Sequence, residues 1–367
     1  MPPRVLFCDS SADWGGVEHW MTITAGELHR RGWSVTVAGR AKGELLARSA
    51  AAGVPTVGWP FRWVIDPVTV WAARRYMLRE RPELTVVALG NDIRTVKLAS
   101  ASMRIPIVWR LGVPYPRLGM RHRLTGKGGV DRVIVPSQFM AARLAQNAWL
   151  KGKIDVIPNG LGAVEVPSAS RVAQTRRDLG WRDDEIVILW VGRFKLQKGV
   201  DTLLQAFAAL RRLSEPQQLR LVLVGTGPED MRLRRLSESL GLEHVVEFAG
   251  YQREPSPYFD ACDILALPSH VETFGNVLLE AMARAKPIVA SNTGGIPEVV
   301  GPDSALLVPA QDESALTASL HELVSNLSRR RTMGEAGRQR FLAHFTLERM
   351  GDDIESSFRR ILDPTLG

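Results

Sequence analysis

Short apolar runs rich in β-branched residues alternate with helical segments along nearly the whole of this 367-residue chain. The alternation predicts βαβ units, in which a helix connects two parallel strands. Parallel sheets of this kind bind their ligands at the carboxyl ends of the strands, so we expect site residues in the loops that follow them. The predicted strands cover residues 4–10, 34–40, 85–89, 106–111, 131–137, 185–193, 219–227, 245–250, 263–269, 287–291 and 305–309.

The length of the chain and one cluster of turn-forming residues predict two domains. A chain of this length is too long for one compact core of average size. The segment "IDVIPNGLGAVEVPSAS" separates two series of strands and helices, and its turn formers are Pro158, Asn159, Gly160, Gly162 and Pro167. We predict an α/β protein with a Rossmann-like N-terminal domain over residues 1–165 and a second Rossmann-like domain over residues 166–345.

The composition is that of an ordinary globular protein, with 45% hydrophobic and 23% charged residues. The longest apolar runs have strand length, so no transmembrane helix is predicted. The sequence starts directly on a strand without a signal-peptide pattern, and its two cysteines, Cys8 and Cys262, suit a reducing compartment. We therefore expect a cytoplasmic location.

The formal net charge of +8 is compatible with nucleic acid, an anionic membrane surface or a polyanionic small substrate. One stretch, "RLGVPYPRLGMRHRLTGKGG", contains no acid and interleaves its cations with Leu, Met, Tyr and Val. Such a stretch fits the interface of an anionic bilayer at the inner face of the membrane, and it equally fits a solvated basic loop. Its cations are Arg110, Arg117, Arg121, Arg123 and Lys127.

The stretch "ETFGNVLLE" places a carboxylate at each end, Glu272 and Glu280. If a helix begins near Gly275, its free N–H groups face the Thr273–Asn276 segment and favour a phosphate there. The spacing corresponds to about 12 Å along a helix, comparable to the distance from ribose to sugar ring in a nucleotide-sugar. Each carboxylate could then accept hydrogen bonds from hydroxyls at one end of such a ligand.

Three further loops between a predicted strand and a helix carry candidate ligand contacts. "GRFKLQKG" presents Arg193 and Lys198, which suit a diphosphate clamp, although two solvated cations remain an alternative. "DWGGVEHW" allows close backbone approach at Gly16 but is not a complete GxGxxG pattern. "GTGPED" fits either a nucleotide-binding edge or a plain turn.

Taken together, Gly192–Arg193, Lys198–Gly199, "LVGTGPE", "PSHVETFGNVLLEAMA" and "PIVASNTGGIPEVV" resemble the retaining GT-B glycosyltransferases, in particular glycosyltransferase family 4 (group 1). The resemblance covers nearly the whole chain and is stronger in the second half. It implies two Rossmann-like domains that face a central cleft, a final helix over residues 346–367 that returns to the N-terminal domain, and a hinge at "VIPNG".

The resemblance also implies roles for individual residues. Arg193 and Lys198 would hold the donor diphosphate and stabilise the leaving group, and Glu272 would contact the donor sugar near the reacting carbon. Glu280 would bind the ribose hydroxyls. The remaining donor contacts would come from the backbone of Phe274, Gly275, Asn276 and Val277 and, across the cleft, from Gly16. Such enzymes need no metal and no cofactor, and the sequence contains no Asp-x-Asp triplet.

The first domain departs from the family pattern. Many relatives have a histidine at the end of the strand that reads "PIVWRLG" here, whereas this chain has Arg110, with Asn91 and Asp92 one strand earlier. These three residues are the acceptor or first-domain candidates. Trp14 and Trp63 are further candidates for lining an acceptor site.

The resulting prediction is a retaining, metal-independent glycosyltransferase that uses a nucleotide-sugar, with a UDP-sugar favoured over a GDP-sugar. The expected acceptor is a glycan or lipid-linked saccharide of the cell envelope, as in polysaccharide or lipopolysaccharide synthesis. Two alternatives remain: another GT-B enzyme, such as a nucleotide-sugar epimerase or a sugar phosphorylase, and a basic nucleic-acid-binding protein. The second lacks support, because the sequence shows no recognised nucleic-acid motif. No obligate protein partner is indicated.

Overall fold

The computed structural model describes residues 2–112, 129–213 and 219–363, and the chain forms two compact units. The first unit contains Met1–Gly160 together with Leu347–Gly367, and the second contains Leu161–Thr346. The boundary thus lies at Gly160 rather than at residue 165, and the final helix belongs to the first unit. The predicted membrane contacts Arg117, Arg121, Arg123 and Lys127 lie outside the described residues.

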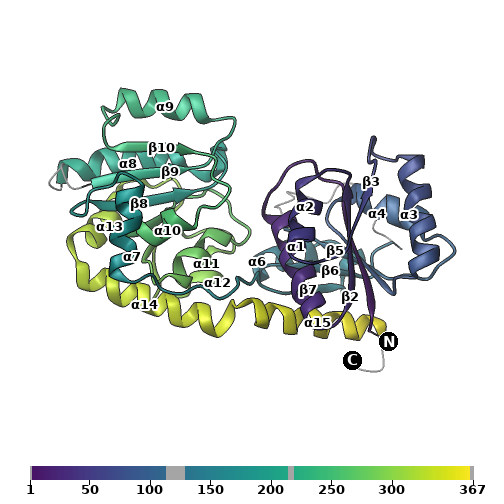
Figure 1. Cartoon of the computed structure of the whole chain (residues 1–367). Helices are drawn as coiled ribbons and strands as arrows, with labels where there is room; N and C mark the ends of the chain where they lie inside the picture. The colour runs from purple at the N-terminus through teal and green to yellow at the C-terminus, as the bar shows by residue number, and fades with distance from the viewer. Residues whose placement is uncertain (1, 113–128, 214–218, 364–367) are drawn as a thin grey trace. The chain divides into compact units, whose positions relative to one another are not determined.

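The first unit is built on a seven-stranded parallel sheet with the order β3-β2-β1-β4-β5-β6-β7 (Figure 1). Its strands are β1 (Arg4–Asp9), β2 (Ser34–Arg40), β3 (Thr56–Trp59), β4 (Leu84–Val87), β5 (Ile107–Arg110), β6 (Arg132–Val135) and β7 (Ile154–Val156). Its helices are α1 (Gly16–Arg30), α2 (Glu44–Ala51), α3 (Pro67–Glu80), α4 (Gly90–Ala99), α6 (Gln138–Ala145), the short η1 (Ala148–Leu150) and α15 (Leu347–Leu362).

The second unit has a six-stranded parallel sheet with the order β10-β9-β8-β11-β12-β13. Its strands are β8 (Ile186–Val191), β9 (Leu219–Val224), β10 (Val246–Gly250), β11 (Ile264–Leu267), β12 (Ile288–Ser291) and β13 (Ala305–Val308). Its helices are α7 (Ala169–Asp178), η2 (Leu196–Lys198), α8 (Val200–Leu213), α9 (Asp230–Ser239), α10 (Ser256–Ala261), α11 (Asn276–Ala283), α12 (Ile296–Val300), α13 (Glu313–Ser325) and α14 (Leu327–His344). The predicted α/β class with two Rossmann-like sheets is confirmed.

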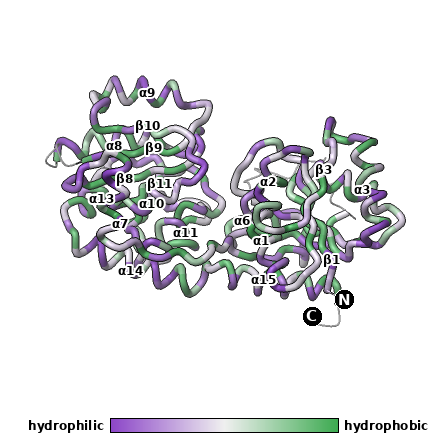
Figure 2. The backbone as a smooth tube through the Cα atoms, viewed as in Figure 1, coloured by the Kyte–Doolittle hydropathy of each residue, from purple (hydrophilic) through white to green (hydrophobic). Residues whose placement is uncertain are grey.

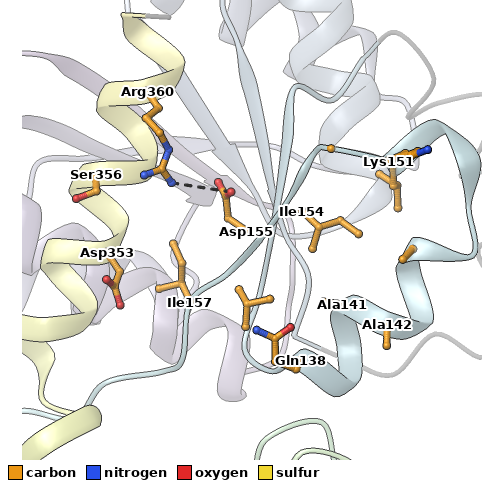
Figure 3. A pocket seen from close by; sticks show the side chains of 14 residues that line it. Gln138, Ala141, Ala142, Lys151, Ile154, Asp155, Ile157, Asp353, Ser356 and Arg360 are labelled. Atoms are coloured by element: carbon orange, nitrogen blue, oxygen red, sulfur yellow. Dashed lines mark ion pairs between the residues drawn. The ribbon is translucent and has the colours of Figure 1, made fainter. Parts of the chain in front are cut away.

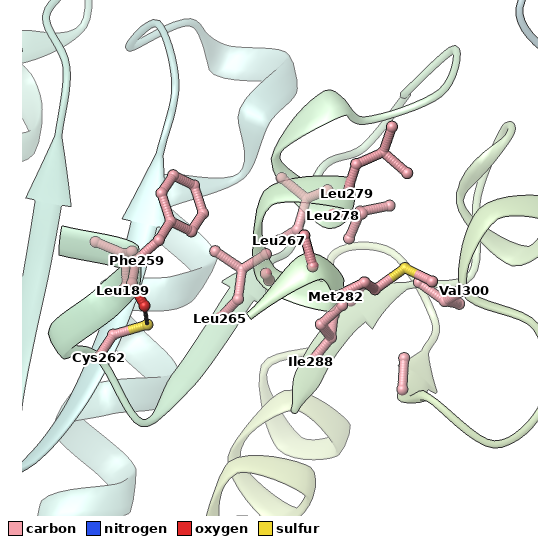
Figure 4. Packing of buried hydrophobic residues seen from close by; sticks show 14 of the residues in the cluster. Leu189, Phe259, Cys262, Leu265, Leu267, Leu278, Leu279, Met282, Ile288 and Val300 are labelled. Atoms are coloured by element: carbon pink, nitrogen blue, oxygen red, sulfur yellow. Dashed lines mark hydrogen bonds between the residues drawn. The ribbon is translucent and has the colours of Figure 1, made fainter. Parts of the chain in front are cut away.

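Both faces of the second sheet are buried, because alternate residues of each strand pack into different clusters. On β8, Leu189 joins one cluster while Ile188 and Trp190 join the other. Figure 4 shows the first cluster, in which Leu265 from β11 lies among side chains from α10 and α11. The hydropathy colouring in Figure 2 marks the same strands as hydrophobic.

The final helix α15 packs into the core of the first unit through residues spaced by four. Met350, Ile354 and Phe358 are buried in a cluster with side chains of β1 and α1. Arg31 adds charged contacts, since its guanidinium donates to Glu27 at 2.6 Å and to Asp352 at 2.6 Å. These contacts hold residues from the two ends of the chain together in one unit.

Two strands lie where the sequence predicts none. β3 and β7 are the edges of the first sheet, and both are only partly buried. An edge strand has one neighbour, so a sequence such as "TVGW" or "IDV" can form a strand without the continuous apolar run that marks a central one.

Substitution by alanine should change the free energy of unfolding in opposite directions at two helical glycines. A Cβ on Gly334 in α14 would lie 1.9 Å from the carbonyl oxygen of Ala285, whereas a Cβ on Gly26 in α1 would meet nothing closer than 3.9 Å. Gly334→Ala should lower the free energy of unfolding by about 2 kcal/mol or more, because backbone must move. Gly26→Ala should raise it by about 0.5–1 kcal/mol, because alanine favours the helix.

Urea unfolding of the two variants beside the wild type measures both effects. An unchanged midpoint for Gly334→Ala would contradict the close packing of α14 on the turn after α11.

Candidate functional site

Four loops that follow neighbouring strands of the second sheet contact one another at its carboxyl edge. The loops follow β9, β8, β11 and β12, which are consecutive in the sheet. The contacts between them consist largely of backbone hydrogen bonds and glycine packing. This edge is where an open parallel sheet binds its ligands, so the candidate site lies among these loops.

The loop after β8 is supported by the glycine turn after β9. Phe194 N–H donates to the carbonyl of Thr226 at 2.9 Å. A Cβ on Gly225 would lie 1.8 Å from the Gly192 oxygen, and one on Gly227 would lie 2.4 Å from the Phe194 oxygen. The "GTG" turn therefore has a packing role: it lets the chain that carries Arg193 sit against it. Arg193 itself is exposed, whereas the neighbouring Phe194 is buried.

The loop after β11 is held from both sides. His270 N–H donates to the carbonyl of Gln197 in the β8 loop at 2.8 Å, and Gly295 N–H in the β12 loop donates to the carbonyl of Glu272 at 3.0 Å. Gly294 has a φ of +60°, and a Cβ there would lie 1.8 Å from the Glu272 oxygen. The backbone of Glu272 is thus fixed by glycines from the following loop.

Lys198 and Glu272 form an ion pair across these loops, with 2.5 Å between Nζ and Oε2. The side chains are 23% and 12% exposed, so the pair is largely withdrawn from water. The other carboxylate oxygen, Oε1, accepts from Thr273 N–H at 3.2 Å. The structure therefore brings together two of the three predicted catalytic side chains, although it does so through a contact that the sequence does not predict.

The helix α11 begins one residue after Gly275, which has a φ of +87°. Phe274 cannot offer its side chain to a ligand, because that ring is 3% exposed and packs edge-on against Phe345 at 6.0 Å. The contact predicted for this segment is therefore limited to its backbone. Asn276 and Val277 form the first turn of the helix and are partly exposed.

Glu280 lies further along α11 and belongs to a chain of charges. Its Oε2 accepts from Arg284 Nη1 at 2.8 Å, and Arg284 Nε pairs with Asp260 at 2.6 Å. Burial raises the pKa of Glu280 above its usual value, and Arg284 opposes this shift. Among the residues that the structure describes, Oε1 of Glu280 has no hydrogen-bond partner. The spacing of four between Glu280 and Arg284 is the sequence signal that could have identified this pair.

In the first unit, carboxyl groups gather at the carboxyl edge of β1 and β4. Asp9 and Asp92 are fully buried and Glu18 is 9% exposed. Burial, followed by repulsion from Asp92 and Glu18, raises the pKa of Asp9 to about 8. Burial likewise raises the pKa of Asp92 to about 6, although Ser10 and the backbone of Leu89 hydrogen-bond to it. Asp92 is a predicted residue, whereas Asp9 and Glu18 are additions from the structure.

Arg110 is buried rather than presented to solvent, with 2% exposure. Its Nη2 donates to Asn159 Oδ1 at 2.5 Å, Nη1 donates to the carbonyl of Ile134 at 3.3 Å, and the guanidinium lies 4.6 Å from the ring of Trp20. Burial lowers the pKa of Arg110 to about 9. Of the other first-unit candidates, Gly16 is the exposed first residue of α1 and Asn91 is a partly buried residue of α4.

A cavity of about 850 Å³ lies elsewhere in the first unit, between α6, the edge strand β7 and α15 (Figure 3). Gln138, Asp155 and Arg360 line it, and the last two are 4.0 Å apart. None of the predicted site residues lines this cavity, so it is not the candidate site.

Among residues 2–112, 129–213 and 219–363, no group of three or more histidine, cysteine, aspartate or glutamate side chains is arranged to hold a metal ion. Within the same residues, no helix combines the length and the apolar character that crossing a bilayer requires.

Two family profiles match the chain. The profile described as glycosyl transferases group 1 matches residues 172–340, and the profile of glycosyltransferase family 4 matches residues 14–162. The two matches fall in the second and first units, respectively.

Curated relatives extend the likeness. A Corynebacterium glutamicum GDP-mannose-dependent monoacylated alpha-(1-6)-phosphatidylinositol monomannoside mannosyltransferase is 30% identical over 81% of this chain and 82% of its own length. A D-inositol 3-phosphate glycosyltransferase of Stackebrandtia nassauensis is 35% identical over 64% of this chain. The matched region spans only 58% of the latter relative's length.

Solved structures show the same fold. The Anabaena protein HepE, crystallised with UDP and glucose, has a TM-score of 0.85 at 22% identity and covers 96% of this chain and 98% of its own. Sucrose-phosphate synthase from Thermosynechococcus elongatus has a TM-score of 0.83 at 23% identity, over 99% of this chain and 100% of its own. The predicted GT-B fold is confirmed.

The acid cluster predicts an unusual pH dependence. Because the pKa of Asp9 is raised in the folded state, its contribution to stability is present below pH 4 and is lost as the pH rises through about 8. Asp9→Asn does not titrate, so it should gain stability relative to the wild type between these pH values, by on the order of 3 kcal/mol. Urea unfolding at pH 5 and pH 8.5 measures the difference.

Glu80→Gln, which removes an exposed carboxylate of α3, is the matched control for the loss of a carboxylate elsewhere in the first unit. If Asp9→Asn and the wild type differed in free energy of unfolding by the same amount at both pH values, burial and repulsion would not raise the pKa of Asp9.

Proposed function

Because the chain belongs to glycosyltransferase family 4 (group 1), we propose that it is a retaining, metal-independent glycosyltransferase that uses a nucleotide-diphosphate sugar. A UDP-sugar is the favoured donor and a GDP-sugar is the next. The acceptor is a glycan or lipid-linked saccharide of the cell envelope. The observation that carries the proposal is the Lys198–Glu272 ion pair, held at the carboxyl edge of the second sheet by four converging loops.

The donor diphosphate would bind to Lys198 and Arg193 beside the first turn of α11. An ammonium and a forked guanidinium on one strand-end loop suit two adjacent phosphates, and the helix N-terminus adds oriented N–H groups. In the free protein, Lys198 is neutralised by Glu272 at 2.5 Å. A bound diphosphate would compete for the ammonium, which leaves Oε2 of Glu272 able to accept a hydrogen bond from a sugar hydroxyl.

The ribose would bind at Glu280. Arg284 holds one carboxylate oxygen and leaves Oε1 as a hydrogen-bond acceptor for a vicinal hydroxyl. Arg284 is in turn fixed by Asp260 at 2.6 Å, so the Glu280 side chain is positioned before the donor arrives. Pre-organisation of this kind reduces the entropy lost on binding.

The relatives support the choice of donor and acceptor without deciding it. The solved structure of HepE contains UDP and glucose, whereas the Corynebacterium relative is named as GDP-mannose-dependent. Other relatives are named as lipopolysaccharide core glycosyltransferases of Rhizobium meliloti and an O-antigen chain mannosyltransferase of Escherichia coli. These names favour a cell-envelope saccharide as acceptor.

The proposed reaction is a displacement on one face of the sugar. The acceptor oxygen forms a bond to the anomeric carbon as the bond from that carbon to the donor phosphate breaks, and the acceptor proton passes to the leaving phosphate. Lys198 and Arg193 stabilise the charge that develops on that phosphate. Glu272 is hydrogen-bonded and ion-paired, so it serves to orient the sugar rather than to attack it.

A thermal-shift panel of UDP, GDP, ADP and their sugar conjugates tests the donor site. A UDP-sugar near one hundred times its Kd should raise the melting temperature by about 5 °C or more. Glu280→Ala should remove most of this rise because it removes the ribose acceptor, and Glu238→Ala, at an exposed position on α9, should retain it. Each variant is compared with its own melting temperature without ligand.

If only GDP conjugates raise the melting temperature, the donor is a GDP-sugar rather than a UDP-sugar. If no nucleotide raises it, the proposed donor site is contradicted. Equal rises in wild type and Glu280→Ala would exclude the ribose contact.

The stereochemical proposal has a separate test. With a donor of α configuration, the product should also have the α configuration, which NMR of the anomeric proton shows directly. Mass spectrometry of the enzyme with donor should show no glycosyl adduct. A trapped adduct or a β product would contradict a one-step retaining displacement.

A further inference from the structure

Exposed hydrophobic side chains gather on the loop after β3 and on the outer face of α3. Trp63 is 66% exposed and Trp71 is 62% exposed, and Val64, Ile65 and Val68 are each about half exposed. Other exposed large hydrophobics of the described residues are scattered along the chain, as is normal for a folded surface. A contiguous group of this kind marks an interaction surface.

The loop that presents Trp63 is fixed rather than loose. Asp66 accepts hydrogen bonds from Val68 N–H at 3.1 Å, Thr69 Oγ1 at 2.8 Å and Arg62 Nη2 at 2.9 Å. Thr69 Oγ1 also accepts from the N–H of the buried Phe61 at 2.8 Å. The guanidinium of Arg62 holds the pKa of Asp66 well below its usual range. This network keeps the apolar side chains of the loop in water although they could otherwise collapse.

The helix continues the surface. Val68, Trp71, Arg75 and Leu78 are exposed and recur at intervals of three and four, so they lie on one face of α3. The opposite face packs into the core through buried side chains, among them Met77. In an ordinary surface helix the outward face is polar, whereas here it carries a tryptophan and two aliphatic residues. Figure 1 shows α3 beside β3 at the edge of the first unit.

The charges on this surface are positive. Between residues 60 and 80 the cations are Arg62, Arg74, Arg75 and Arg79. Of the two acids, Asp66 is buried against Arg62 and Glu80 pairs with Arg79 at 2.6 Å, so the charge that remains is positive. The Arg62 guanidinium lies 4.9 Å from the ring of Trp63, and that of Arg75 lies 5.6 Å from the ring of Trp71. Tryptophan beside arginine, with aliphatic side chains between, is the composition of a protein face that sits among anionic headgroups.

We propose that the first unit docks on an anionic lipid bilayer through this surface, which we call the α3 docking surface and which consists of Arg62, Trp63, Val64, Ile65, Val68, Trp71, Arg75 and Leu78. The tryptophans and aliphatic residues enter the headgroup boundary, and the arginines pair with lipid phosphates. The residues are separate from the basic stretch 110–129 on which the sequence-based expectation of membrane contact rests.

The position of the docking surface connects it to the acceptor. The loop of Trp63 follows β3, so it lies at the same carboxyl edge of the first sheet as Asp9 and Asp92. Docking would bring this edge to the membrane, where a lipid-linked saccharide presents its sugars. This step rests on the proposed function, whereas lipid binding itself does not, since it is measured without donor or acceptor.

Vesicle co-sedimentation tests the proposal with the full chain. The wild type should sediment with phosphatidylglycerol–phosphatidylcholine vesicles and much less with pure phosphatidylcholine. Trp63→Ala/Trp71→Ala should lower the partition coefficient about tenfold or more, because two large apolar side chains no longer enter the interface. Arg75→Gln should lower it about fivefold and reduce its sensitivity to salt, at about 1 kcal/mol per cation.

A matched control removes exposed apolar side chains elsewhere. Met231 is 69% exposed and Leu327 is 52% exposed, both in the second unit, and Met231→Ala/Leu327→Ala should sediment like the wild type. Trp63→Phe/Trp71→Phe should retain most of the binding. All variants should melt within a degree or two of the wild type, since the changed side chains are exposed.

The proposal is overturned if the wild type does not bind anionic vesicles, which is also the result expected if this face receives a protein partner. It is equally overturned if Trp63→Ala/Trp71→Ala binds as well as the wild type, because another surface would then hold the lipid. If the double tryptophan variant melts early, the sedimentation of Arg75→Gln decides the question instead.

Discussion

The candidate site depends on one constraint: the backbone of the loop that carries Glu272 must lie in contact with glycines of the next loop. Gly294 leaves no room for a side chain beside the Glu272 carbonyl, Gly295 N–H donates to that carbonyl at 3.0 Å, and Gly199 likewise packs against Pro268. Because these contacts are made by backbone, they fix the position of Glu272 more firmly than side chains could. The short ion pair with Lys198 follows from that fixed position.

The candidate site of the second unit and the acid cluster of the first unit hold buried charge in different ways. In the second unit the buried charges are paired, as in Glu280, Arg284 and Asp260, so side chains are oriented at little electrostatic cost. In the first unit, Asp9, Asp92 and Glu18 are like charges in a buried place, and Arg110 is a buried cation whose side chain bonds to an amide and a carbonyl. Groups with perturbed pKa values are typical of functional sites, although structural networks also produce them.

The order of strands and helices could be predicted from the sequence because central strands of parallel sheets are continuous apolar runs, as in "IVILWV". The edge strands β3 and β7 lack such runs and escaped prediction. Candidate site residues could be proposed from the sequence where a motif is contiguous, as from Glu272 to Glu280. The Lys198–Glu272 contact could not be predicted, because it joins residues 74 positions apart. The exposure of Trp63 also could not be predicted, since a tryptophan next to aliphatic residues in a sequence is equally compatible with a core.

The hydrogen bonds to Asp66 fix the loop of the α3 docking surface in a conformation that exposes its apolar side chains. A loop whose apolar residues gain nothing from folding would be expected to be short or mobile. Here a buried, ionised aspartate instead accepts hydrogen bonds from three residues, Arg62, Val68 and Thr69, and so holds Trp63 and its neighbours in water. Hydrated apolar area of this kind lowers the stability of the isolated protein, and it becomes favourable only when the surface is covered. The surrounding cations would repel a second copy of the same face. An anionic bilayer instead buries the apolar side chains and pairs its phosphates with the arginines.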